Sequence, residues 1–179
     1  MTSKQEAHWV LRAQCDDREA IERLLQSVQP SITRYVRALV GPRHADDITQ
    51  EVLVTIYRKI AWLSSPDLFR PWAFRIASRT AFRYLKKERR WPDHLRDDEA
   101  LDDIAAPDLA EIARDVDRLL QDEHVTPASR AVLALHFKEG MTLPEVAAVL
   151  DIPLGTVKSR LGYGLATLRR HHAAGEHHD

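Results

Sequence analysis

The chain is predicted to be all-α, with two small helical domains joined by an acidic flexible linker. Three observations predict this fold. Apolar residues recur at helical spacing through most of the 179 residues, and no segment alternates as a strand does. Residues 92–107 interrupt the helical pattern with two prolines and many carboxylates. Toward the C-terminal end, two short helical patterns meet at a tight turn, which is the layout of a helix-turn-helix.

The first predicted domain spans residues 5–91 and contains helical patterns near 5–27, 30–40, 44–62 and 71–90. In the third pattern, apolar residues recur every four positions and predict a buried stripe. The stripe consists of Ile48, Val52, Ile56 and Ile60. Polar residues gather on another face of this helix, and on composition alone that face is an ordinary solvated surface.

The fourth helical pattern separates an apolar side from a cationic side. At about 100° per residue, the apolar side holds Phe74, Ala77, Ala81 and Leu85. The opposite side holds Arg75, Arg79, Arg83, Lys86 and Arg90. A cationic stripe of this length is typical of a surface that binds a phosphate backbone. Trp72 is predicted on the cationic side and Phe69 in the loop before it, where aromatic rings can stack on unpaired bases; a core position is the alternative for Trp72.

The net charge of −1 conceals two blocks of opposite charge. Residues 70–90 carry eight cations against Glu88, whereas residues 93–123 carry twelve carboxylates against three arginines. Residues 92–107, which include the start of the acidic block, contain two prolines and few apolar residues. Residues 92–107 are therefore predicted to be a linker.

The second predicted domain spans residues 108–172. Its helical patterns lie near 109–122, 127–138, 142–150 and 154–171. The last two form the predicted helix-turn-helix. Thr142 is placed to cap the first helix, with Pro144 in its first turn. Asp151 falls at the turn, where aspartate tolerates a left-handed conformation better than most residues.

Apolar positions of the helix-turn-helix are predicted to pack inward. They are Val146, Ala147 and Leu150 in the first helix, and Val157 and Leu161 in the second. The second helix opens with short polar residues and cations, which suit contacts with phosphates and base edges. These residues are Thr156, Lys158, Ser159 and Arg160.

Composition excludes several classes of protein. No apolar run approaches the ~20 residues that span a bilayer, and the N-terminus lacks the order of a signal peptide, so a cytoplasmic protein is expected. Cys15 is the single cysteine, which excludes an intrachain disulfide and a cysteine-based zinc site. Residues 173–179 are predicted to be a disordered, histidine-containing tail, with no metal site or cofactor. The alternative is that the four histidines of HHAAGEHHD bind a metal ion.

The ordered motifs resemble the extracytoplasmic-function (group IV) sigma factors of bacterial RNA polymerase, within the sigma-70 family. Residues 45–60, ADDITQEVLVTIYRKI, look like the polymerase-binding helix of region 2. Residues 69–90 look like the helix and loop that read and melt the −10 promoter element. Residues 126–161 are similar to region 4, which reads the −35 element. The match covers nearly the whole chain, in order.

The resemblance implies a role for each matching residue. Binding to the clamp helices of the largest polymerase subunit is implied for Asp46, Asp47, Gln50, Glu51 and Arg58. Contact with single-stranded DNA at the −10 element is implied for Ser65, Asp67, Phe69, Arg70, Trp72, Arg75, Arg79, Thr80, Arg83, Lys86 and Lys87. Contact with duplex DNA at the −35 element is implied for Thr142, Pro153, Gly155, Thr156, Lys158, Ser159, Arg160 and Tyr163.

The resemblance also implies partners. They are core RNA polymerase, with the flap of its second-largest subunit as a further contact, promoter DNA, and an anti-sigma protein. The apolar sides of helices 44–62 and 127–138 are the expected landing sites of the anti-sigma protein. The polymerase performs the chemistry, so no catalytic residue and no cofactor are implied for the chain.

Two departures from the family pattern limit these expectations. Gly162 and Gly164 interrupt the predicted recognition helix, and each costs about 1 kcal/mol against alanine, so a short or bent helix is expected there. Thr80 and Arg83 occupy positions where the family often has Asn and Asp, which leaves the −10 preference open.

Two other functions remain open from the sequence. A dimeric helix-turn-helix regulator would bind duplex operators without needing the ADDITQEV surface. A helical adaptor would use the cationic stripe to bind acidic protein partners. Polymerase-dependent transcription separates these functions from that of a sigma factor.

Overall fold

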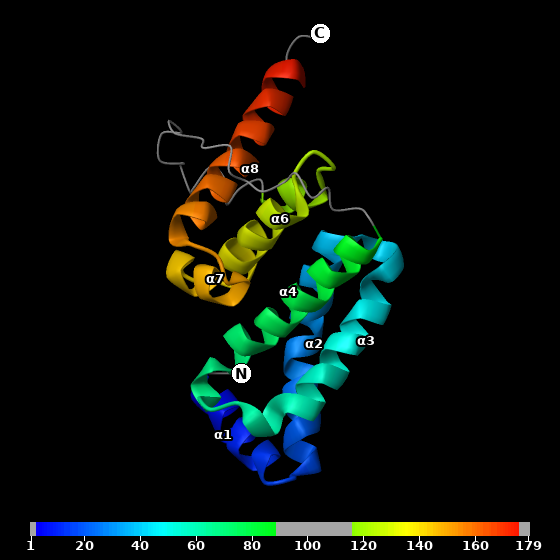
Figure 1. Cartoon of the computed structure of the whole chain (residues 1–179), viewed down its shortest axis with the longest axis vertical. Coiled ribbons are helices and arrows are strands. Elements are labelled where there is room, and N and C mark those ends of the chain that lie inside the picture. The colour runs from blue at the N-terminus through cyan, green and yellow to red at the C-terminus, as the bar shows by residue number, and fades with distance from the viewer. Residues whose placement is uncertain (1–2, 89–115, 176–179) are drawn as a thin grey trace. The chain divides into compact units, whose positions relative to one another are not determined.

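The structure, a computed structural model, describes residues 3–88 and 116–175 (Figure 1). Within these ranges the chain consists of helices and turns and has no strand, which confirms the predicted all-α class. The chain divides into two compact units, Met1–Glu88 and Arg89–Asp179. The predicted linker 92–107 lies outside the described residues.

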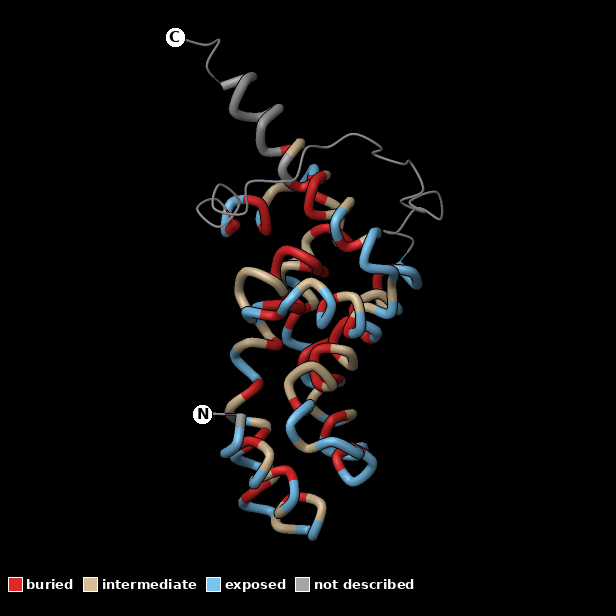
Figure 2. Tube along the Cα trace, turned by 90° about the vertical axis from the view of Figure 1, so that its left-hand side faces the viewer, coloured by how far each residue is buried: buried red, intermediate tan, exposed pale blue. Residues whose placement is uncertain are grey.

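The first unit is built from four α-helices: α1 (Ser3–Gln14), α2 (Arg18–Val40), α3 (Pro42–Lys59) and α4 (Phe69–Lys87). Two 3₁₀ turns, Ile60–Trp62 and Pro66–Leu68, connect α3 to α4. α2 packs against α1, α3 and α4. The predicted apolar stripes of α3 and α4 are buried. Along the helices, buried segments alternate with exposed ones (Figure 2).

The first helix boundary predicted from the sequence is wrong. The sequence predicted separate helices at 5–27 and 30–40, but α2 runs unbroken across this boundary, with Pro30 exposed inside it. The chain breaks instead between α1 and α2, where Asp16 has a φ of 62° and Asp17 caps α2 by accepting a hydrogen bond from the Ala20 N–H at 3.1 Å. The cap at Asp17 stabilises the start of α2, and α2 continues through Pro30 even though a proline cannot donate a helical hydrogen bond.

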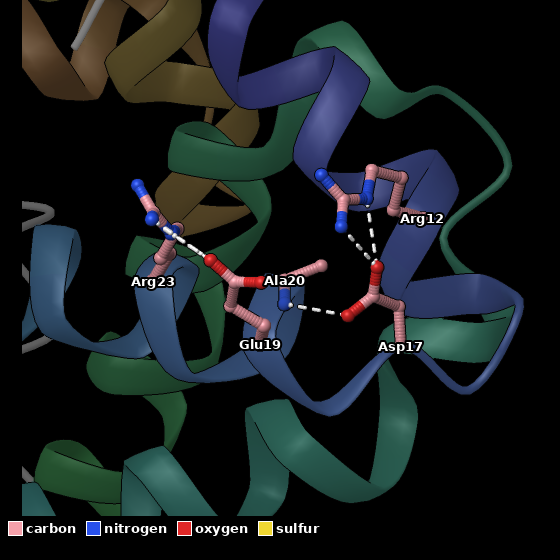
Figure 3. A network of polar contacts seen from close by, with 5 residues as sticks. All are labelled: Arg12, Asp17, Glu19, Ala20 and Arg23. Carbon is pink, nitrogen blue, oxygen red and sulfur yellow. Dashed lines mark hydrogen bonds and ion pairs between the residues drawn. The ribbon is translucent and has the colours of Figure 1, made fainter.

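Side chains at this junction fix α1 against α2 (Figure 3). Arg12 Nη2 lies 2.6 Å from Asp17 Oδ2, and Arg23 pairs with Glu19 one helical turn away at 2.8 Å. The Arg12 and Arg23 guanidinium carbons lie 4.5 and 4.8 Å from the centre of the Trp9 ring. The Ala20 N–H, together with Arg12, lowers the pKa of the Asp17 carboxyl. The junction is thus held by both ionic and cation–π contacts.

The second unit contains a helical segment at 116–121, α6 (Pro127–Leu133), α7 (Leu143–Leu150) and α8 (Leu154–Gly175). The predicted helix 127–138 is α6 followed by a π-helical turn, Ala134–Lys138. α6 packs against α8 through an apolar core. Its members include Leu119, Val132, Leu133, Leu135, Val157 and Leu161.

α8 departs from the expectation of a short recognition helix. It continues through Gly162 and Gly164 and extends to Gly175, beyond the predicted end at 171. A Cβ added at Gly164 would lie 3.3 Å from Leu133 Cδ1. The glycine therefore lets α8 approach α6 closely, and this packing offsets its low helix propensity.

One further prediction about an apolar face needs correction. In α7, Val146 and Val149 are buried, whereas Ala147 and Leu150 are only partly buried. In helix 44–62 the apolar stripe is buried while Val54, Tyr57 and Trp62 are exposed, and the landing sites of an anti-sigma protein stay a prediction. Among the described helices, none combines the length and the apolar character needed to cross a membrane.

Candidate nucleic-acid interface

The predicted polymerase-binding residues all lie on the surface of α3. Asp46, Asp47, Gln50, Glu51 and Arg58 are exposed. Asp46 Oδ1 lies 3.7 Å from Arg37 Nη2 of α2, while Glu51 forms a close ion pair with Arg83 of α4. This pair joins the acidic α3 face directly to the cationic α4 surface.

The cationic surface of α4 follows the predicted stripe. Arg79, Arg83, Lys86 and Lys87 are exposed and Arg75 is partly buried. Because cations of one helix line one side of the unit, a negatively charged strand can contact several of them at once. Arg90 lies outside the described residues.

Arg70 has a structural partner that the sequence did not predict. Its Nε lies 2.8 Å from Oε1 of Glu6, and the Glu6 side chain is only 6% exposed. A buried carboxylate requires such a partner, so Arg70 anchors α1 to the start of α4. Only tertiary structure brings residues 64 positions apart together.

The prediction that Phe69 and Thr80 lie on the −10 surface is wrong. Phe69 is 1% exposed and Thr80 is 5% exposed, so both belong to the core and not to the DNA-facing side. Phe69 is the first residue of α4, where it continues the buried stripe of Ala73 and Ala77 one and two turns later. Trp72 is partly buried, with its ring centre 6.3 Å from that of Phe69.

The segment between α3 and α4 carries the predicted loop residues. Ser65 and Asp67 are exposed there. The loop is closed by a hydrogen bond from the Leu68 N–H to the Ser65 carbonyl at 2.9 Å. Sequence reasoning missed Trp62 in this segment, which is 75% exposed. Its position after the last periodic residue of helix 44–62 is the signal that could have found it.

The helix-turn-helix has the predicted local geometry. Thr142 Oγ1 accepts a hydrogen bond from the Glu145 N–H at 3.4 Å, and Glu145 Oε2 accepts from the Thr142 N–H at 2.7 Å. Hydrogen bonds from the side chain and N–H of Thr142 lower the pKa of the Glu145 carboxyl. Asp151 ends α7 in the left-handed conformation at φ 59° and ψ 47°, as predicted. The turn is therefore fixed at both ends of α7.

The start of α8 presents the predicted −35 residues. Pro153, Gly155 and Lys158 are exposed, as is Thr142 at the start of α7. Partly exposed positions are taken by Thr156, Ser159, Arg160 and Tyr163. Val157 and Leu161, at 0% and 1% exposure, anchor the opposite side of the helix. Polar groups at the N-terminus of a helix suit contact with phosphates and base edges.

Comparison with known proteins gives a match to each unit. Residues 24–91 match the model of sigma-70 region 2, and residues 123–170 match that of sigma-70 region 4. The RNA polymerase sigma-H factor of Pseudomonas aeruginosa is 29% identical over 90% of each chain. The ECF RNA polymerase sigma-E factor of Haemophilus influenzae is 28% identical, over 85% of this chain and 87% of the relative. The chain belongs to the ECF group of the sigma-70 family.

The fold of this sigma factor is also found among solved structures. The structure of CnrH in complex with the cytosolic domain of CnrY aligns with a TM-score of 0.64 at 24% identity, over 94% of this chain and 97% of that one. The sigma-70 family is one of transcription initiation factors that are not enzymes. The region 2 match begins at residue 24, so α1 lies outside it.

Proposed function

We propose that the chain binds core RNA polymerase and directs it to a set of promoters, where it starts transcription without catalytic residues of its own. The observation that carries the proposal is the order of three surfaces in a chain that matches both sigma-70 regions. The acidic face of α3 comes first, the cationic face of α4 second, and the capped α7–α8 helix-turn-helix last. An adaptor or an operator-binding dimer does not require all three. Since core polymerase is a cytoplasmic enzyme, we place the chain in the cytoplasm.

The exposed face of α3 is the proposed polymerase-binding surface. Its carboxylates complement a cationic partner, and such complementarity speeds association and fixes the register of two proteins. Reversing Asp47 and Glu51 to Lys should weaken binding to core polymerase and leave the helical content unchanged. Glu22→Lys, at an exposed position of α2, is the matched control. Unchanged core affinity of the double variant in a pull-down would remove α3 from the interface.

The face of α4 is the proposed site for the melted −10 strand. Arg75, Arg79, Arg83, Lys86 and Lys87 would hold the phosphates, and the loop Ser64–Leu68 would receive an unpaired base. Phe69 and Thr80 take no direct part in this proposal because both are buried. The expected signature is a strong dependence of single-strand binding on salt concentration.

The start of α8 is the proposed −35 reading surface. Arg160→Ala and Lys158→Ala in the holoenzyme should weaken promoter binding. A lost bidentate base contact costs ~1–3 kcal/mol of discrimination between sequences, while a lost phosphate contact lowers the salt slope by about one. If both variants keep the parent's affinity and salt slope, α8 does not read this element.

Regulation by an anti-sigma protein is part of the proposal. CnrH, which has the same fold, was solved in complex with the cytosolic domain of CnrY. Because the apolar stripe of α3 is buried, a partner would have to bind exposed groups of that helix, of which Val54 and Tyr57 are 44% and 55% exposed.

The deciding experiment is transcription by core polymerase on the DNA upstream of the chain's own gene, with and without the chain. A sigma factor yields a transcript with a defined start only when it is added. A dimeric regulator would change transcription only by polymerase that already carries another sigma factor, and an adaptor would do neither.

A further inference from the structure

Trp62 is the most exposed of the large hydrophobic side chains in the described ranges. Its exposed fraction is 75%, against 55% for Leu11 and Tyr57. An indole of this exposure gains nothing from the fold, since the stabilisation from a tryptophan comes from its buried area. The ring is thus available to a partner.

The turn that carries Trp62 is fixed from both sides. Ile60 and Leu63, its neighbours in the 3₁₀ turn, are 5% and 7% exposed and anchor it to the core. The side-chain amide of Gln14 in α1 donates to the Ile60 carbonyl at 3.0 Å and to the Leu63 carbonyl at 2.8 Å. These contacts fix the backbone on both sides of Trp62, and in this turn the indole is exposed.

The residues that flank Trp62 along the chain are charged and polar. Two cations, Arg58 and Lys59, precede it, and the nearest carboxylate after it is Asp67. Both cations are exposed, as are the hydroxyl-bearing Ser64 and Ser65 that follow the indole. An aromatic ring among cations suits a nucleic-acid strand, whose bases stack on the ring while its phosphates meet the charges.

Because Phe69 is buried, Trp62 is the exposed aromatic residue next to the loop Ser64–Leu68. Phe69 was the predicted stacking residue of the loop, but it is in the core. Trp62 precedes the same loop and faces solvent. We propose that Trp62 is a stacking platform for an unpaired base of the melted promoter strand, beside the base held by the loop Ser64–Leu68. This inference rests on the proposed function.

The test uses holoenzyme made from core polymerase and the full chain. The template is a promoter on which the parent protein starts transcription, prepared with a mismatched −10 segment so that the bubble is already open. Trp62→Ala should weaken binding to this template by about tenfold, the effect expected when one base–aromatic stack is lost, and Trp62→Phe should restore most of it. Leu11→Ala, which removes another exposed apolar side chain, should have no effect.

Affinity for core polymerase, measured without DNA, should be the same for the parent and Trp62→Ala. A loss of core affinity with unchanged bubble binding of the assembled holoenzyme would assign Trp62 to a protein interface and overturn the proposal. Unchanged values in both measurements would overturn it as well. If the parent itself directs no promoter-specific transcript, the proposed function fails, and this outcome is visible before any variant is compared.

Discussion

Thr142 and Glu145 show how single residues fix the start of α7, the first helix of the helix-turn-helix. Each accepts a hydrogen bond from the other's backbone N–H, and Thr142 lowers the pKa of the Glu145 carboxyl from its usual value of 4.5. A capping box of this kind satisfies two N–H groups that the first turn of a helix leaves without partners. The start of α7 therefore depends on one hydroxyl and one carboxylate.

We expect Thr142→Ala to lower the free energy of unfolding of the second unit by about 1 kcal/mol at neutral pH. Because the folded pKa of Glu145 is lowered, the carboxylate stabilises the fold above the usual glutamate range and loses this contribution as the pH falls through the folded pKa. The difference between parent and variant should accordingly shrink in acid. Urea unfolding at neutral and acid pH measures it.

Thr126 provides the matched control. It caps α6 by accepting a hydrogen bond from the Ser129 N–H at 3.2 Å, and the third helical position there is a serine and not a carboxylate. Thr126→Ala should cost a similar amount at every pH. Equal pH dependence in the two variants would show that Glu145 takes no part in the cap.

At the scale of elements, the contact between α6 and α8 depends on Gly164. Gly164→Val would place atoms against Leu133, so we expect a loss of ~1–3 kcal/mol in the free energy of unfolding of the second unit. Gly155→Ala is the control, since nothing lies within 4 Å of a Cβ at that position. It should be neutral or slightly stabilising. The melting temperatures of Gly164→Val and Gly155→Ala test this prediction. Equal melting temperatures would contradict the close approach of α6 and α8.

The connection between α3 and α4 depends on α1. Gln14→Ala removes both hydrogen bonds to the turn at 60–63, and we expect faster amide hydrogen exchange across residues 60–68 with little change elsewhere in the unit. The loss in the free energy of unfolding should be about 1–2 kcal/mol, as for two hydrogen bonds of ordinary strength. Gln26→Ala, at an exposed position of α2, should leave exchange unchanged. Unchanged exchange in Gln14→Ala would mean that the turn holds its shape without α1.

Most of this architecture could be predicted from the sequence, because periodicity reports burial directly. The stripes of α3 and α4, the cap at Thr142 and the left-handed Asp151 follow from local patterns, and the structure confirms them. The predictions fail where contacts between distant parts of the chain determine whether a residue is buried or paired. Phe69 and Thr80 look like surface residues beside cations until their helix is packed, and Glu6 has no sequence signal that links it to Arg70.

At the scale of the whole molecule, opposite charges lie close together along the chain. Residues 93–123 carry a net charge of −9 and follow a block of +7 at residues 70–90. A short flexible tether gives effective concentrations in the millimolar range, so even a weak contact between these blocks can compete with DNA. The acidic block lies largely outside the described residues, and its shielding role stays a prediction.

Changing Asp97, Asp98, Asp102 and Asp103 to Asn should raise the affinity of the free protein for single-stranded −10 DNA. The gain should be clear at about 0.01 M salt, where charges interact over roughly 30 Å, and should vanish near 1 M, where screening acts within ~3 Å. Fluorescence anisotropy of a labelled oligonucleotide measures both. If the affinity for the oligonucleotide does not rise at low salt, the acidic block does not shield the cationic stripe. Only a partner protein could then keep the free chain from binding DNA.

α1 also bears on how the protein should be shortened for experiments. The match to sigma-70 region 2 begins at residue 24, and a chain cut there would lack the Trp9 ring between two arginines, the Glu6 partner of Arg70 and the Gln14 amide. It would also expose the side of α2 that packs against α1. Such a fragment would keep α3 and α4, but the turn between them would lose the hydrogen bonds from Gln14. We therefore expect it to bind DNA poorly if this segment contacts the promoter as proposed. The first compact unit therefore includes α1, which lies ahead of the residues that match the family model.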